Sequence, residues 1–131
     1  MLNKLVQGIV DVNGVKVVNT TPHPINMVSM DLSTQVVVPT SGMLVNAKAT
    51  AQPVDSGIAG VKFQKTTFIP DADTLDVLRQ FKDMHPDVVV IGSLIGAQAY
   101  PGLVVGMVAH PDFVRVPPAD KKMLIDTYTV Y

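Results

Sequence analysis

Proline and glycine divide this chain into short apolar runs, and no other feature constrains its fold as strongly. Its 131 residues include ten prolines and nine glycines, which interrupt regular structure and mark turns. Several runs between them are rich in valine and isoleucine, which favour strands. In one case, residues 10–12 and 15–18 flank Asn13-Gly14, the pair best suited to a type I′ hairpin turn. The pattern therefore predicts a strand-rich fold.

Hydrophobic patterning predicts where the remaining strands lie. They are expected over residues 25–30, 34–38, 43–50, 61–69, 88–91, 103–108, 113–116 and 124–131, with a turn over residues 52–57. Residues 88–108 also admit a short strand–helix–strand unit, because small and apolar residues at 93–100 separate two apolar runs. The predicted fold class is α+β: a mostly antiparallel, strand-rich single domain over residues 1–131.

One main helix is predicted over about residues 73–84. Asp71 or Asp73 can cap its start, and Pro86 stops it. Its apolar side is expected to contain Val77, Phe81 and Met84, with Leu78 widening the stripe.

Composition limits the partners that this chain can have. Charged residues make up only 16% and hydrophobic residues 47%, whereas roughly a quarter of an ordinary domain is charged. A small domain with so little charge is expected to bury surface in a homo-oligomer or against a partner. With a net charge of −1 and no basic run longer than Lys121-Lys122, neither nucleic acid nor a membrane is an expected partner.

Some classes of chemistry are absent from the sequence itself. The chain contains no cysteine, which excludes disulfides and thiolate chemistry. It contains no glutamate either, and its aspartates show no convincing pairing for acid–base catalysis. We therefore predict no catalytic residue, no metal site and no cofactor.

The best candidate binding site is the loop over residues 19–24. Its prolines stiffen the backbone, while Asn19, Thr20, Thr21 and His23 offer polar groups to a ligand. The alternative interpretation is a structural corner between strands, with Asn19 or Thr20 bonding nearby backbone.

A second candidate is the turn at Gly92 and Ser93, which follows a predicted buried strand. It matches neither the nucleophile-elbow, the phosphate-loop nor the dinucleotide-binding pattern. A backbone cradle for an anion is one interpretation. Close packing of a helix built from small residues is the other.

All three histidines precede proline: His23, His85 and His110. The residue before proline is pushed out of the helical region, so the histidines are expected in turns with their rings at the surface. The alternative is a metal site assembled from all three, since imidazole suits zinc or copper.

Several motifs resemble a group of small proteins from bacteriophages and actinobacteria. Residues 19–25, Asn-Thr-Thr-Pro-His-Pro-Ile, resemble the Asn-Leu-Thr-Pro-His-x-Ile with which those proteins open. Further resemblances follow in the same order at residues 39–42 (with one inserted residue), 60–66 and 90–99. The helix near residues 73–84 and the C-terminal part depart from the pattern. The resemblance implies a phage or prophage accessory protein and carries over no catalytic residue.

Three functions follow as hypotheses. The first is a non-catalytic, oligomeric binding protein of phage type, acting in the bacterial host cytoplasm on a host protein or on a small ligand such as a nucleotide signal. The second is a virion decoration or assembly protein. The third is a small metal-dependent hydrolase centred on His23 with Asp87 or Asp112.

Overall fold

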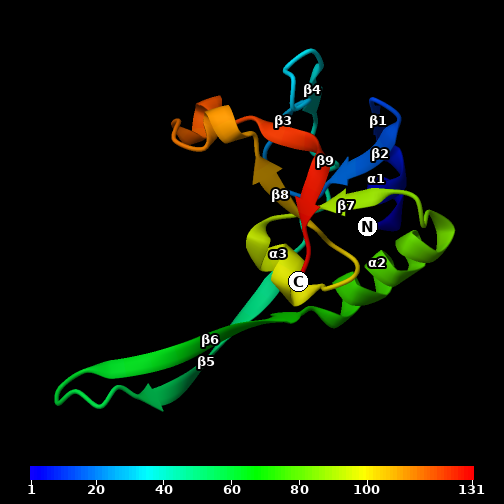
Figure 1. Ribbon diagram of the computed structural model, residues 1–131. Helices are drawn as coiled ribbons and strands as arrows, with labels where there is room; N and C mark the ends of the chain where they lie inside the picture. Colours follow the sequence, from blue (N-terminus) through cyan, green and yellow to red (C-terminus); the bar gives the residue numbers. More distant parts are fainter.

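Strands from distant parts of the chain assemble into three separate sheets (Figure 1). The computed structural model describes residues 1–131. In chain order the elements are α1 (Leu2–Gln7), β1 (Val10–Val12), β2 (Val15–Asn19), β3 (Ile25–Val28), β4 (Gln35–Val38), β5 (Ala47–Asp55), β6 (Lys62–Pro70), α2 (Ala72–Met84), β7 (Val89–Ile91), α3 (Leu94–Ala99), β8 (Gly106–Ala109), the 3₁₀ helices η1 (Pro111–Phe113) and η2 (Pro118–Asp120), and β9 (Met123–Thr129). The sheets have the orders β1-β2-β7, β4-β3-β9-β8 and β5-β6. The predicted α+β, strand-rich class is confirmed.

Two predicted hairpins form, the first over the expected residues and the second with shorter strands than expected. β1 and β2 pair antiparallel around Asn13 and Gly14, and both of these residues have positive φ (54° and 88°), as a type I′ turn requires. β3 pairs with β4 in the same way, around a turn that contains Asp31. Local turn chemistry is sufficient to predict both.

Two parallel pairings connect the halves of the chain. β2 pairs with β7, so that Val18 lies beside Val90, and β3 pairs with β9, so that Val28 lies beside Leu124. The strand–helix–strand unit predicted over residues 88–108 forms as β7, α3 and β8. Its strands belong to different sheets and meet only in a parallel bridge between Ile91 and Val105.

Helix α2 forms as predicted, with Asp71 as its N-cap. The Asp71 carboxylate accepts a 3.0 Å hydrogen bond from the Thr74 amide. Leu78 and Phe81 are fully buried, but Met84 is 59% exposed, so its predicted place in the apolar stripe is wrong. The end of the helix is covered instead by His85, whose ring lies 5.1 Å from that of Phe81.

The buried side chains form two clusters. The larger contains Leu5 and Phe81, and it joins α1, α2 and α3 to one side of β7. The smaller contains Val17 and Met27, and it fills the space between the β1-β2-β7 sheet and the four-stranded sheet. None of the helices combines the length and the apolar composition that spanning a membrane requires.

Three predicted segments differ from the structure. Residues 52–57 were expected to turn and residues 43–50 to be a strand, but β5 begins at Ala47 and continues through Pro53 to Asp55. Proline is tolerated there because β5 has a single neighbour, and an edge strand does not need every N–H group. Residues 113–116 were also expected to be a strand, but Phe113 ends η1 and residues 114–116 form a turn. The His110 ring caps η1 by accepting a hydrogen bond from the Asp112 amide.

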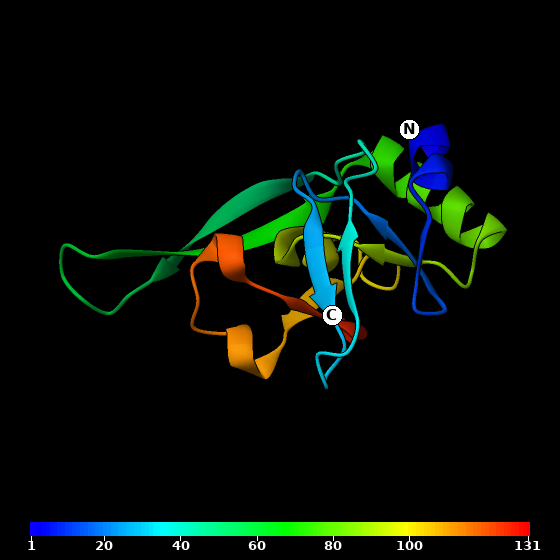
Figure 2. The ribbon, with the colours of Figure 1, turned by 90° about the horizontal axis from the view of Figure 1, so that it is seen from above.

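β5 and β6 form an arm, residues 47–70, that projects from the rest of the molecule (Figures 1 and 2). We call the remainder the body. Phe68 and Ala47 pack against the larger core cluster at the base of the arm. Beyond that base nearly every arm residue is exposed. The arm is therefore anchored at one end only.

Candidate functional site

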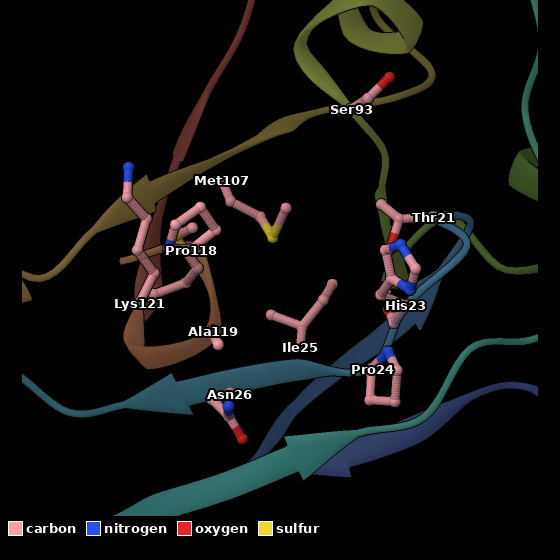
Figure 3. Close-up of a pocket in the computed structure, with 11 residues that line it drawn as sticks. Thr21, His23, Pro24, Ile25, Asn26, Ser93, Met107, Pro118, Ala119 and Lys121 are labelled. Carbon is pink, nitrogen blue, oxygen red and sulfur yellow. Dashed lines mark hydrogen bonds between the residues drawn. The ribbon is translucent and has the colours of Figure 1, made fainter. Parts of the chain in front are cut away.

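An open cavity of about 660 Å³ lies where the predicted binding loop meets the four-stranded sheet (Figure 3). Loop residues, strand residues from β3, β8 and β9, and the segment around η2 form its walls. The lining residues are Thr21, His23, Pro24, Ile25, Asn26, Ser93, Met107, Pro118, Ala119, Lys121 and Met123. Three of the six predicted ligand-binding residues are among them: Thr21, His23 and Ser93.

Asn19 is fully buried and holds the loop in shape. Its amide nitrogen donates hydrogen bonds to the carbonyl oxygens of His23 (2.8 Å) and Val38 (3.3 Å). Its amide oxygen accepts from the backbone N–H (2.8 Å) and the hydroxyl (2.7 Å) of Thr21. For Asn19 the interpretation as a structural corner is therefore confirmed, and its bonds fix the loop before any ligand arrives.

Thr20 brings the two predicted sites side by side. Its backbone N–H and its hydroxyl both donate to the carbonyl oxygen of Ile91, at 2.9 and 2.8 Å. Gly92 comes next in the chain, and a Cβ atom there would lie 2.6 Å from Val104 Cγ1 and 3.3 Å from Thr20 Oγ1. Thr20 and Gly92 thus join the loop to the turn by close packing, and neither lines the cavity.

Ser93 and Thr21 line the cavity, but their hydroxyls are engaged within the protein. Ser93 Oγ accepts a 3.1 Å bond from the Gly96 amide and so caps α3. The Thr21 hydroxyl is bonded to Asn19, as described above. These two residues therefore shape the wall of the cavity more than they offer free donors.

The apolar part of the lining comes from residues that no local sequence pattern indicated. Met107 of β8 and Ile25 of β3 point toward one another across the cavity (Figure 3). Met123 of β9 and Pro118 of η2 add further apolar surface. Nothing in the local sequence around Pro118 indicates that this segment faces the loop at residues 19–24.

Lys121 is the only charged side chain of the lining, which also contains the imidazole ring of His23. Lys121 lies on one side of the cavity and the His23 imidazole on the other (Figure 3). No carboxylate belongs to the lining. A mostly apolar cavity with a cationic group at its edge and no acidic group suits a ligand that combines an apolar body with an anionic group.

The three histidines do not converge. His110 is buried, only 3% exposed, so its predicted surface position is wrong. One ring nitrogen accepts from the Asp112 amide, which makes the other the donor to the Met30 carbonyl oxygen at 2.8 Å. His85 ends α2, and His23 lies at the cavity. No group of three or more His, Cys, Asp or Glu side chains forms that could hold a metal ion, so the hypothesised three-histidine site does not exist in this fold.

Comparisons with protein-family models, with curated proteins and with solved structures find no match to this chain.

Proposed function

We propose that this chain is a non-catalytic binding protein that holds a small, partly apolar anion in the cavity beside the loop at residues 19–24. The observation that carries the proposal is the pairing of Lys121 with apolar walls in a lining that contains no carboxylate. An anion entering this cavity gains a charge-assisted contact and meets no like charge.

The stiffness of the loop supports the same function. Asn19 and Thr20 hold the loop through bonds to backbone and to Thr21, so little conformational entropy is lost when a ligand binds. A nucleotide is one ligand of the proposed class. Its base would lie against Ile25 and Met107, since a methionine sulfur contacts flat rings favourably, and its phosphate would pair with Lys121.

The setting of this function is proposed from the resemblance of residues 19–25 to phage and actinobacterial proteins. An accessory protein made during infection would act in the bacterial host cytoplasm, where nucleotides serve as signals. A binding role there needs no catalytic group, in keeping with a cavity whose hydroxyls are engaged in holding the fold.

Native mass spectrometry of freshly purified protein tests for a retained ligand, because an adduct adds to the 14.0 kDa mass of the chain. Calorimetry with adenosine monophosphate and a cyclic dinucleotide then tests the proposed class, with uncharged adenosine as the comparison. We expect the anions to bind and Lys121→Met to weaken them by roughly 10-fold, the effect of losing one charge-assisted contact.

The neighbouring Lys122→Met is the matched control. Lys122 does not line the cavity, and its ammonium group lies 4.9 Å from the centre of the Phe113 ring. This substitution should leave anion affinity unchanged. Unliganded protein in the mass spectrum, together with no binding of either nucleotide, would rule the proposal out.

A further inference from the structure

The β5–β6 arm carries large apolar side chains that are exposed to solvent and that no other element of the chain covers. Val54, Ile58, Val61 and Phe63 lie near its tip, and Phe63 is 50% exposed. The two strands have no other neighbour in a sheet. An isolated two-stranded hairpin is at best marginally stable in water, and clustered exposed apolar residues mark an interaction site.

The register of the two strands separates the arm into unlike faces. Lys48 pairs with Ile69, Gln52 with Lys65, and Val54 with Phe63. Since side chains alternate across a strand, these six residues share one face, which we call the basic face. Asp55, the only acidic residue of the arm, pairs with Lys62 on the other face. The basic face thus combines two lysines and three large apolar side chains with no carboxylate.

The body carries a net charge opposite in sign to that of the arm. Three lysines and one aspartate give residues 47–70 a net charge of +2, whereas the seven basic and ten acidic residues of the body give −3. The solvent side of α2 is notably acidic. Asp73, Asp76 and Asp83 recur there at helical spacing, beside the exposed Met84. The exposed Arg79 of the same helix lies on another flank, beside Pro70 and Leu103.

The lysines of the arm and the aspartates of α2 form no ion pairs within one molecule. The only ion pair in the structure joins Lys16 to Asp87, at 3.5 Å. The arm also points away from α2 (Figure 1), although Pro70 at the end of β6 is separated from α2 by Asp71 alone. The basic face therefore cannot reach the acidic side of its own α2.

We propose that the basic face of the arm docks on the acidic outer side of α2 in a second copy of this chain. Lys48 and Lys65 would then meet Asp73, Asp76 and Asp83, and Phe63 and Val54 would be buried beside Met84. An anionic lipid surface is less suited to the arm, because the acidic body and the net charge of −1 oppose close approach of the molecule.

Light scattering of the full chain after size-exclusion chromatography tests the proposal. We expect a mass above the 14.0 kDa of one chain and dissociation as salt is added, because the paired charges lie near solvent. Phe63→Asp should raise the dissociation constant by roughly 30-fold or more, as the loss of a central apolar contact does. Val114→Asp, at an exposed residue outside both surfaces, should leave assembly unchanged.

Charge exchange makes the test specific for the partner. Lys65→Glu alone and Asp76→Lys alone should each weaken assembly by about 10-fold. The two changes together should restore much of it, because the pair is re-formed with reversed signs. Circular dichroism should be unchanged in all variants, since none of these residues belongs to the core clusters.

Three outcomes would overturn the proposal: a wild-type monomer at every concentration, assembly that Phe63→Asp leaves intact, or a monomer that binds phosphatidylserine vesicles through the arm. Each is independent of the cavity, because Lys121→Met should alter ligand binding and not assembly.

Discussion

The hydroxyl of Tyr100 donates a 2.6 Å hydrogen bond to the backbone carbonyl oxygen of Asn46. The same hydroxyl accepts a 2.8 Å bond from the Asp71 amide. Asn46 directly precedes β5 and Asp71 directly follows β6. One side chain, only 1% exposed, therefore fastens both ends of the arm to the end of α3.

Tyr100→Phe should lower the free energy of unfolding by about 1–3 kcal/mol, the cost of leaving buried polar groups without a partner. Denaturant unfolding measures this loss, and hydrogen exchange at the Asp71 amide should accelerate. Tyr131→Phe, at an exposed hydroxyl without a bond, is the control. Equal stability of the two variants would show that Tyr100 does not hold the arm.

Asn19→Ala should lower the free energy of unfolding by about 2–3 kcal/mol, because the buried Thr21 amide loses its acceptor and the His23 carbonyl keeps only the Thr21 hydroxyl as a donor. Asn19→Asp should also destabilise, since it keeps the acceptor, loses the donor and buries a charge. Thermal unfolding measures both. The exposed Asn3→Ala in α1 should cost nothing, and a similar cost at both asparagines would contradict this account.

Gly92→Ala should lower the free energy of unfolding by about 1–3 kcal/mol, because the new methyl group meets Val104 Cγ1 at 2.6 Å in a packed core. The double variant with Val104→Ala has room for that methyl group. Its loss of stability should therefore be smaller than the sum of the two single losses. Additive losses in denaturant unfolding would show that the two residues do not compete for the same space.

Asp31, in the turn between β3 and β4, should make the free energy of unfolding depend on pH in the acid range. Hydrogen bonds from the Ser33 and Ser29 side chains and the Ser33 amide lower the pKa of Asp31 from 3.8 to about 2. The carboxylate therefore stabilises the fold above about pH 4, and this contribution is lost as the pH falls from 4 toward 2.

An NMR titration of the Asp31 carboxyl carbon measures this pKa directly. Ser33→Ala removes the largest cause and should raise the pKa toward its ordinary value. Asp31→Asn should flatten the dependence of Tm on pH in the same acid range. An unchanged titration in Ser33→Ala would contradict the role of these hydrogen bonds.

The elements that could be predicted from sequence depend on contacts within a few residues. The Asn13-Gly14 turn and the Asp71 cap of α2 both act on neighbouring backbone. The wrong predictions concern segments whose local pattern was overridden by their place in the fold. Pro53 indicated a turn, but a free sheet edge accommodates it in β5.

Some residues of the candidate site could be predicted from local sequence and others could not. The loop with Thr21 and His23 stood out because prolines and polar groups are close together in sequence. Met107 and Lys121 did not, because nothing near them in the chain records that they face that loop.

The Asn13-Gly14 turn, the Asp71 cap and most of the strands could be predicted from local sequence, since they depend on backbone sterics and neighbouring hydrogen bonds. The low content of charged residues follows from composition alone. The packing of Thr20 against Gly92, the burial of His110 and the free position of the arm could not be predicted from any local pattern. Each of these depends on which apolar faces pack together across long stretches of chain. The packing of the whole core determines which faces meet, so no single segment is sufficient to predict it.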